Sequence, residues 1–320
     1  MNAWIEARVA RRETAAEGIV SFELKRADGA ALPAFSAGSH IDVELPNGLV
    51  RQYSLCNPPS EDGRYEIGVL LEVDGRGGSR SAHEQLVAGA LLRIGAPRNH
   101  FALAPSARHS VLLAGGIGVT PMLAMAEALT VADASFEMHY CTRSLARTAF
   151  AARIAAAPYA SRVQCHHDDG PTAQRFDAER VLADPRPEAH LYVCGPKGYM
   201  DHVLGTARRL GWAESSIHFE YFAAAPIDHS ADGPFELTLA RSGRVIAVAA
   251  GETVIAALAA QGIEVPVSCE QGICGTCILP VLEGTPDHRD MVLSAAEHAA
   301  NNQFTPCCSR AKTPRLVIDL

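Results

Sequence analysis

Three closely spaced cysteines constrain this chain more than any other feature. The residues from Cys269 through Cys274 to Cys277 read C-x4-C-x2-C, and a fourth cysteine, Cys307, follows further along the chain. This is the ligand spacing of a plant-type [2Fe–2S] cluster. Such a cluster passes one electron at a time, so the spacing assigns the chain to electron transfer.

The residues between these cysteines suit a loop that wraps closely around a cluster. Gly272, Gly275 and Thr276 are small, so backbone N–H groups can point at sulfur, and glycine tolerates a positive φ. The alternative is a structural zinc site, which also uses four cysteines. Zinc sites favour two short C-x2–4-C knuckles. Here the last cysteine has no partner knuckle, which favours the cluster.

The composition is typical of a globular protein with more than one domain. A chain of 320 residues exceeds what one core usually holds, so we expect two or three domains. No apolar run approaches the roughly 18–20 residues of a membrane span. Residues 1–6 lack the features of a signal peptide, so we expect a cytoplasmic protein without membrane contact. The net charge of −8, with no basic tract, argues against a nucleic-acid partner.

The sequence holds nine cysteines, which in a cytosolic protein suggest ligands or catalytic thiols rather than disulfides. Four of them stand singly in apolar, strand-like surroundings. We expect each of these four to be a small buried hydrophobic residue. They are Cys56, Cys141, Cys165 and Cys194.

The first segment, residues 1–106, predicts an antiparallel β-barrel. Short alternating runs are separated there by Gly, Pro and Asn, which is typical of closely spaced strands. The predicted strands cover residues 19–24, 40–45, 49–55, 65–72 and 90–94.

The second segment, residues 107–223, predicts an α/β domain with a parallel sheet. A buried strand at 111–114 leads through glycines into a helix at 121–129. Helix-like stretches then alternate with further strands, which is the pattern of a parallel sheet with crossover helices. Those strands are predicted at 136–141, 162–167 and 190–194.

The last part of the chain predicts a linker and a small α+β domain. Residues 224–234 have the small, polar and proline-rich composition of a linker. The domain at 235–320 would contain a hairpin, an amphipathic helix, the cysteine loop and a final strand. These elements are predicted at 235–240, 244–249, 253–261 and 315–320.

A candidate flavin site begins with Arg51, Tyr53 and Ser54 at the end of a predicted barrel strand. The arginine could clamp a phosphate and the tyrosine could pack on a flavin ring. The serine hydroxyl could reach the flavin edge at N5. Taken alone, the motif is weak, because an exposed arginine beside a core tyrosine is common.

A glycine turn at 76–79 lies further along the same segment, after the predicted strand at 65–72. Gly77, Gly78 and Ser79 precede a plausible helix start, where backbone N–H groups would form an anion site. The alternative is an ordinary glycine turn. Because both motifs precede a nucleotide-type domain, we favour phosphate binding.

A candidate nicotinamide site lies where the strand at 111–114 meets its helix. Gly115, Gly116 and Gly118 would let the backbone approach a pyrophosphate, and Thr120 could sit close to the nicotinamide. Pro121 suits the first turn of the helix. A turn that serves only for packing is the alternative.

A second such turn, Cys194, Gly195 and Pro196, again follows a strand, where open α/β sheets bind ligands. We read Cys194 as a residue that shapes the contact between nicotinamide and flavin, since no base stands at motif spacing. The run at 166–169, His-His-Asp-Asp, would make a poor metal chelate because adjacent strand residues point to opposite faces. We expect a loop near the adenosine end of the cofactor there.

Taken together and in this order, these elements resemble the phthalate dioxygenase reductase family, and especially its vanillate O-demethylase reductases. The resemblance covers essentially the full length. It rests on residues 51–54, 76–79, GGIGVTPM at 115–122, CGPKGYM at 194–200 and the cysteine loop.

The resemblance implies three domains in the order flavin barrel, NAD domain and ferredoxin, with FMN and NADH as cofactors. It also implies the cluster ligands Cys269, Cys274, Cys277 and Cys307, with Cys308 at a position where the family often has another small residue. An aromatic residue at the end of the NAD domain covers the flavin in related reductases. We prefer Phe222 for this role, with Tyr221 as the alternative.

The preference for NADH rests mainly on the resemblance. Arg143 follows the second predicted strand of the α/β domain, and Asp168 or Asp169 could meet the adenosine ribose. An arginine at such a position could also accept a 2′-phosphate, so NADPH stays open at this stage.

The predicted parts fit one electron path. NADH gives up two electrons as a hydride, whereas the cluster accepts one, and flavin chemistry connects the two. Ser54 would orient the flavin, and Thr120 and Cys194 would shape the hydride contact. We therefore predict a monomeric reductase component that serves a Rieske-type oxygenase acting on an aromatic compound. The alternatives are a diiron monooxygenase or cytochrome as acceptor and, in another class, a binding module with structural zinc.

Overall fold

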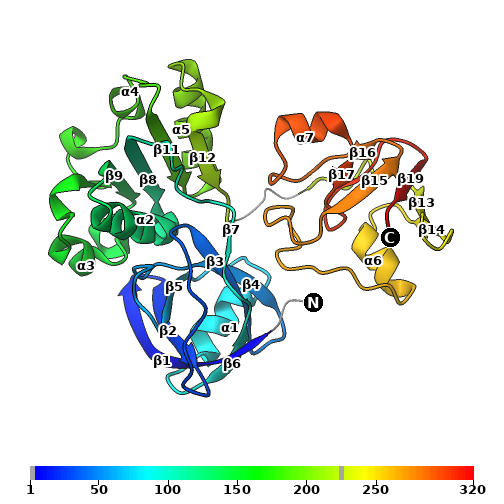
Figure 1. Cartoon of the computed structure of the whole chain (residues 1–320), viewed down its shortest axis with the longest axis horizontal. Coiled ribbons are helices and arrows are strands. Elements are labelled where there is room, and N and C mark those ends of the chain that lie inside the picture. Colours follow the sequence, from blue (N-terminus) through cyan, green and yellow to red (C-terminus); the bar gives the residue numbers. More distant parts are fainter. Residues whose placement is uncertain (1–3, 223–226) are drawn as a thin grey trace. The chain divides into compact units, whose positions relative to one another are not determined.

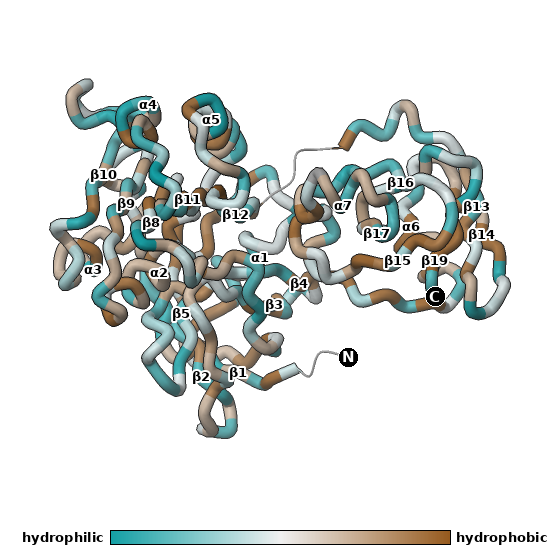
Figure 2. The backbone as a smooth tube through the Cα atoms, turned by 45° about the horizontal axis from the view of Figure 1, so that its top comes forward, coloured by the Kyte–Doolittle hydropathy of each residue, from teal (hydrophilic) through white to brown (hydrophobic). Residues whose placement is uncertain are grey.

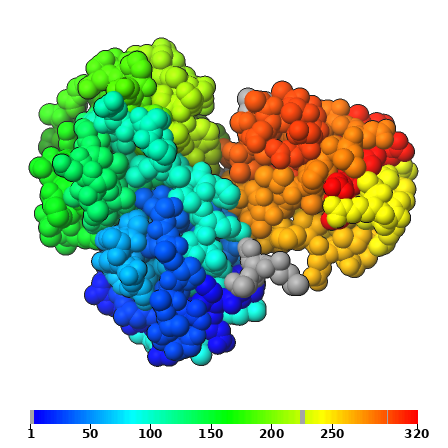
Figure 3. Space-filling model, in the orientation of Figure 1, coloured from blue at the N-terminus to red at the C-terminus, as the bar shows by residue number. Residues whose placement is uncertain are grey.

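The structure, a computed structural model, describes residues 4–222 and 227–320. The described chain separates into two compact units, with the division after Phe222 (Figure 1). In the space-filling view, the first unit comprises the blue, cyan and green atoms and the second the yellow, orange and red ones (Figure 3). None of the helices in the described ranges is long and apolar enough to cross a membrane.

The first part of the larger unit is an antiparallel barrel, as predicted. Its sheet has the strand order β4-β3-β6-β1-β2-β5, and an isolated bridge between Leu55 and Ile67 links the two ends. A short strand, β7 (Arg98–Asn99), also pairs with β3, and helix α1 (Gly78–Gln85) follows β5. The barrel strands are β1 (Ile5–Ala16), β2 (Ile19–Arg26), β3 (Ser39–Glu44), β4 (Val50–Ser54), β5 (Tyr65–Leu70) and β6 (Leu91–Ile94).

Strand β1 is the longest strand of the barrel, and the sequence pattern did not predict it. Of its residues, only Ala7 and Val9 are buried, and the whole second half of the strand is exposed or partly exposed. Apolar and polar residues therefore alternate over too short a stretch to signal a strand. Pairing with β2 and β6 makes this segment a strand.

The second part of the larger unit has a five-stranded parallel sheet in the order β10-β9-β8-β11-β12. Alternate residues of β8 enter two hydrophobic clusters. Leu112 packs in the cluster of helix α2, and Leu113 packs in the cluster of helix α5. Both faces of the sheet are thus covered, as in other parallel sheets. The strands are β8 (His109–Gly115), β9 (Ser135–Thr142), β10 (Val163–His167), β11 (Ala189–Cys194) and β12 (Ile217–Glu220).

Four α-helices belong to this sheet. Helix α5 is amphipathic, and brown and teal segments alternate along it in Figure 2. Short 3-10 turns connect several elements, and η1 (Gly116–Gly118) leads directly into α2. The helices are α2 (Val119–Val131), α3 (Ala151–Ala156), α4 (Ala178–Val181) and α5 (Lys197–Arg209).

The smaller unit is an α+β domain, as predicted. Its sheet runs β14-β13-β19-β15-β17, with β13 and β19 parallel, and β16 pairs separately with β18. The predicted hairpin, helix and last strand correspond to β13, β14, α6 and β19, whereas helix α7 was not predicted. The elements are β13 (Phe235–Leu239), β14 (Val245–Val248), α6 (Val254–Ala260), β15 (Leu279–Glu283), β16 (Pro286–Asp287), α7 (Ala295–Ala300), β17 (Gln303–Phe304), β18 (Arg310–Ala311) and β19 (Arg315–Ile318).

The described end of the predicted linker is bound to this unit. The Asp232 side chain is 1% exposed and accepts a hydrogen bond from Arg289 Nη2 at 2.6 Å. Arg310 Nε lies 3.4 Å from the same carboxylate. Residues 224–226 lie outside the described residues, and the predicted domain limits stay predictions.

The four single cysteines differ in their surroundings. Cys56 and Cys194 are buried and Cys141 is partly buried. The expectation for Cys165 was wrong, because this residue is exposed. It lies on β10, which is an edge strand of the parallel sheet.

Candidate functional site

The four predicted ligands of the cluster form one buried group in the smaller unit. Their exposed fractions are between 3% and 7%. The thiol of Cys269 contacts those of Cys274 and Cys307, and the thiol of Cys277 also contacts that of Cys307. Hydrogen bonds from Cys274 and Cys307 lower the pKa of Cys269 to about 2, although burial opposes this shift. The same contacts raise the pKa of Cys274 and Cys307, so the thiols form one group in mutual contact, as the ligands of a single cluster would.

The cysteine loop has the backbone geometry that the sequence predicted. Gly272 and Gly275 have φ values of 73° and 70°. The N–H groups of Gln271 and Thr276 point at sulfur, at 3.3 Å from Cys269 Sγ and 3.5 Å from Cys274 Sγ. Such N–H donors stabilise thiolate sulfur, so the loop fits a cluster.

The position of Cys307, rather than Cys308, matches that of a ligand. Cys307 contacts Cys269 and Cys277, as well as its neighbour Cys308. Cys308 Sγ instead lies 3.2 Å from Thr305 Oγ1. It also packs so closely on Gly272 that a Cβ atom on this glycine would lie 2.5 Å from the sulfur. Cys308 thus fills the space behind the cysteine loop.

The candidate flavin residues of β4 lie on two faces of the strand. Arg51 pairs with Val43 and Tyr53 with Ile41, and both partners are fully buried. Burial raises the pKa of Tyr53 to about 12, so its hydroxyl stays protonated and can donate a hydrogen bond. Ser54, one residue on, faces the other way.

The predicted phosphate site brings the two flavin motifs together. A Cβ atom on Gly78 would lie 2.9 Å from Arg51 Nε, so the arginine side chain lies directly against the start of α1. Gly77, with φ of 87°, caps that helix. An arginine beside a helix N-terminus fits a phosphate group.

The hydroxyl groups of the two serines at this helix have different surroundings. The hydroxyl of Ser79 accepts a hydrogen bond from the Glu72 N–H at 2.9 Å, so it supports the turn. In contrast, Ser81 Oγ is buried and has no hydrogen-bond partner within the described residues. Sequence reasoning missed Ser81, because a serine inside a helix carries no signal by itself. Its hydroxyl is a better candidate than that of Ser79 for a ligand at the helix start.

A carboxylate from the parallel sheet completes the surroundings of Ser54. The hydroxyl of Ser54 donates to Glu220 Oε2 at 3.2 Å, and His40 Nδ1 lies 3.7 Å from Glu220 Oε1. Glu220 ends β12, which sequence reasoning did not predict as a strand. Since Ser54 is the predicted contact of the flavin edge, Glu220 joins the candidate site.

The two aromatic candidates for covering the flavin differ in packing. The Tyr221 ring packs edge-on against Phe219 and contacts the core around α5. Phe222 is 36% exposed. Phe222 is therefore the freer side chain and remains our preferred candidate.

The two glycine turns of the parallel sheet touch each other. A Cβ atom on Gly118 would overlap the Cys194 carbonyl oxygen, and one on Gly195 would lie 2.9 Å from Gly115 Cα. Pro196 also lies against Gly115. Close packing is thus one reason for these glycines, as the alternative reading held. Gly116 differs, because with φ of 53° it would place a Cβ atom in open space, which leaves room for a ligand.

Thr120 and Cys194 lie beside these turns. Thr120 is 2% exposed and donates to the Ile117 carbonyl at 3.0 Å. A Cβ atom on Gly68 of barrel strand β5 would lie 3.0 Å from Thr120 Cγ2, so this threonine lies at the contact with the barrel. Burial, assisted by Glu220, raises the pKa of the Cys194 thiol well above its usual range. A protonated thiol suits the shaping role predicted for Cys194.

The predicted adenosine loop lies at the carboxyl ends of β9 and β10. Arg143 is exposed there, and its carbonyl accepts a hydrogen bond from the Asp169 N–H at 3.3 Å. The N–H of neighbouring Asp168 bonds to the Thr142 carbonyl. His166 Nδ1 lies 2.7 Å from the Gln174 carbonyl oxygen, so this histidine has a local partner. The structure therefore brings Arg143 and both aspartates to one edge of the sheet.

Comparison with known proteins extends this description to the whole chain. Residues 237–312 match the family of 2Fe-2S iron-sulfur cluster binding domains. The chain is 55% identical over 317 residues to the vanillate O-demethylase oxidoreductase of Pseudomonas putida, covering 99% of this chain and 100% of that protein.

Two solved structures are similar over the full length. Phthalate dioxygenase reductase, described as a modular structure for electron transfer from pyridine nucleotides to [2Fe–2S], matches with a TM-score of 0.76 and 39% identity. The match covers 99% of this chain and 98% of that one. An intact type IV self-sufficient cytochrome P450 monooxygenase matches with a TM-score of 0.88 and 38% identity, over 99% of this chain but 41% of that one. With its iron–sulfur domain and these full-length matches, the chain belongs to the family of oxidoreductases that includes vanillate O-demethylase oxidoreductase and phthalate dioxygenase reductase.

Proposed function

We propose that this protein is the NADH-dependent reductase component of a two-component oxygenase. Electrons would pass from NADH through FMN to the [2Fe–2S] cluster and then to the oxygenase. One observation carries the proposal. One chain contains a domain with four buried cysteines, an antiparallel barrel and a parallel sheet. The barrel and the parallel sheet are connected by the hydrogen bond between Ser54 and Glu220.

Different residues of the larger unit would bind the two organic cofactors. Arg51, Gly77, Gly78 and Ser81 would hold the flavin phosphate, while Tyr53 and Ser54 would orient the ring system. When bound, the flavin connects the two-electron chemistry of NADH with the one-electron chemistry of the cluster.

The nicotinamide would lie at the two glycine turns. Thr120 and Cys194 would shape its contact with the flavin, and Gly116 would leave room for the pyrophosphate. Glu220 would hold the Ser54 hydroxyl in one orientation. Arg143 would lie near the adenosine end, and Phe222 would cover the flavin when the nicotinamide is absent.

The proposed acceptor is a Rieske-type oxygenase that acts on an aromatic compound. The names of the relatives support this choice, since they include oxidoreductases of vanillate O-demethylase and of phthalate 4,5-dioxygenase. A monomeric protein in the cytoplasm, where NADH is available, is part of the proposal.

A second candidate keeps the same electron path but uses another acceptor. The similarity to part of a self-sufficient cytochrome P450 monooxygenase favours this alternative specifically for a haem acceptor. The two candidates differ only in the protein that takes the electron from the cluster.

The visible spectrum under anaerobic conditions tests the electron path. We expect flavin and cluster absorbance in the purified protein, and both should bleach when NADH is added. A zinc-containing protein without cluster absorbance would contradict the proposal. Reduction of a purified Rieske oxygenase, compared with that of a cytochrome P450, then decides between the two acceptors.

A further inference from the structure

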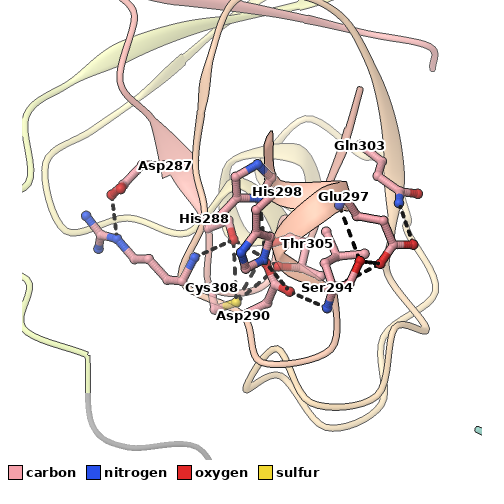
Figure 4. A network of polar contacts seen from close by, with 12 residues as sticks. Asp287, His288, Asp290, Ser294, Glu297, His298, Gln303, Thr305 and Cys308 are labelled. Atoms are coloured by element: carbon pink, nitrogen blue, oxygen red, sulfur yellow. Dashed lines mark hydrogen bonds and ion pairs between the residues drawn. The ribbon is translucent and has the colours of Figure 1, made fainter. Parts of the chain in front are cut away.

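Two histidines and one aspartate converge in the smaller unit, outside the cysteine set. Asp290 follows β16, and His298 lies on α7 (Figure 4). Their candidate donor atoms, together with those of His288, all lie within 4.8 Å of one another. The rings of His288 and His298 stack with centroids 4.4 Å apart and planes at 22°, and both rings border the Asp290 carboxylate (Figure 4).

The strongest sign of a missing ligand is His288. Its side chain is 8% exposed, and neither ring nitrogen has a hydrogen-bond partner within the described residues. Nδ1 lies 3.7 Å from Asp290 Oδ1, which is too far for a hydrogen bond. A buried polar group without a partner is costly, so this ring is incomplete without a further ligand.

Asp290 has an oxygen in a suitable position. Its side chain is fully buried, and Oδ2 accepts a hydrogen bond from the Leu293 N–H at 2.8 Å. This bond fixes the carboxylate and leaves Oδ1 between the two rings. His298 Nε2 lies 3.2 Å from each oxygen.

The distances between these atoms suit coordination of one ion. Bonds of about 2.0–2.2 Å from zinc to imidazole nitrogen and carboxylate oxygen place tetrahedral ligands about 3.3–3.6 Å apart. The observed separations of 3.2 and 3.7 Å bracket that range. Small side-chain rotations would therefore be enough to bring three donors onto one ion.

The charge of the site also suits a cation. Asp290 supplies one negative charge, and the nearest arginine in sequence, Arg289, is already paired with Asp232 and Asp287 at 2.6 and 2.7 Å. Glu297 on α7 accepts hydrogen bonds from Ser294 and so belongs to the helix cap. Two imidazoles and one carboxylate select a divalent transition metal rather than Ca²⁺ or Mg²⁺.

We propose that His288, Asp290 and His298 form a second metal site, for a divalent transition metal ion such as Zn²⁺. The site is separate from the cysteines and does not depend on the proposed electron path. It lies against the cysteine loop, because a Cβ atom on Gly272 would lie 2.9 Å from Asp290 Cα, and the Met291 N–H donates to the Gly272 carbonyl. A bound ion would hold residues 288–298 together behind this loop.

Zinc binding to the full-length protein, with cluster and flavin present, tests the proposal. After dialysis against increasing free Zn²⁺, bound zinc and iron are measured in the same samples. We expect one zinc per chain in addition to the cluster iron. His298→Gln should weaken this binding at least about tenfold, since even outer-shell changes cost 10–100-fold. His202→Gln, the same change at an exposed histidine of α5, should bind zinc as the wild type does.

Zinc X-ray absorption of the wild type provides a readout that needs no variant. We expect nitrogen and oxygen neighbours at about 2.0–2.2 Å. Sulfur neighbours at about 2.3 Å would place the zinc on the cysteines and overturn the proposal. Wild-type affinity in His298→Gln would overturn it as well, and so would the absence of bound zinc in a wild type with full iron content.

Discussion

At the scale of the residue, the two adjacent cysteines near the C-terminus have different surroundings. Cys307 contacts the thiols of two other predicted ligands, whereas Cys308 contacts Thr305 and fills the space behind Gly272. Two residues of the same type, side by side in sequence, are thus expected to differ in function. Their substitution is the most direct test of the ligand assignment.

We expect Cys307→Ser to lose most of the cluster, because a thiolate ligand is removed. Cys308→Ser is the matched control and should keep the cluster, since its sulfur is not a ligand. Iron content and visible absorbance of the purified proteins measure the difference. Retention of the cluster in Cys307→Ser together with its loss in Cys308→Ser would reverse the assignment.

Ser54 allows a second prediction at this scale. Ser54→Ala removes the hydrogen bond to Glu220 and the predicted contact with the flavin edge. A hydrogen bond to a charged group contributes about 1.5–3 kcal/mol, so flavin reduction by NADH should slow about tenfold or more. Stopped-flow measurement at saturating NADH gives this rate.

The same substitution at Ser106, which is exposed, should leave the rate unchanged. The flavin content of both variants must match that of the wild type, so that the rate reports orientation rather than binding. An unchanged rate in Ser54→Ala would remove this residue from the candidate site.

At the scale of the element, the turn after β8 and the turn after β11 depend on each other. Gly118 has no room for a Cβ atom because the Cys194 carbonyl occupies that space. Gly198, on α5, would place a Cβ atom in open space. The two glycines therefore provide a test and a control within one domain.

We expect Gly118→Ala to lower the free energy of unfolding by about 1–3 kcal/mol, as overpacking does. It should also raise the KM for NADH, because both turns must shift. Gly198→Ala should be neutral or stabilising by at most about 1 kcal/mol. Denaturant unfolding measures the free energy of unfolding of both variants. Equal stability of the two would show that the turns are not in close contact.

Another element-scale prediction concerns the segment before β13. Asp232 accepts hydrogen bonds from His229 and Arg289 and lies near Arg310, which is itself 3% exposed. Asp232→Asn should destabilise the smaller unit by about 3 kcal/mol, because it leaves buried positive charge uncompensated. Asp228→Asn is the control, since Asp228 is exposed. Loss of cluster absorbance on heating reports the stability of this unit.

The pH dependence of the same ion pair follows from its pKa. Burial opposes ionisation of Asp232, but the hydrogen bonds from Arg289 and His229 outweigh it, so the pKa of Asp232 falls below 3.8. A lowered pKa means that the stabilisation is present above pH 3.8 and is lost as the pH falls through the folded-state value. The wild type and Asp232→Asn should therefore converge in stability in strong acid.

At the scale of the whole molecule, the electron capacity tests whether both redox centres belong to one chain. A flavin takes two electrons and the cluster one, so full reduction needs about three electrons, or about 1.5 molecules of NADH per chain. Anaerobic titration followed by absorbance measures this value. Cys307→Ser should stop at about one NADH, and an unchanged endpoint in that variant would contradict the proposed path.

The sequence by itself determined the chemistry of this protein and the class of each part. Cysteine spacing predicted the cluster domain, because ligand geometry fixes distances along the chain. Alternating and helical periodicities predicted the barrel and the parallel sheet, since one or both faces of each element must be buried.

Only the tertiary structure decided which distant residues meet. Strands β1 and β12 form because neighbouring strands pair with them. Their own patterns of apolar and polar residues are too weak or too short to predict a strand. The contact of Glu220 with Ser54, the burial of the Ser81 hydroxyl and the group formed by His288, Asp290 and His298 likewise depend on folding. Such contacts join residues far apart in sequence, where no local spacing rule applies, so packing of the whole chain determines them.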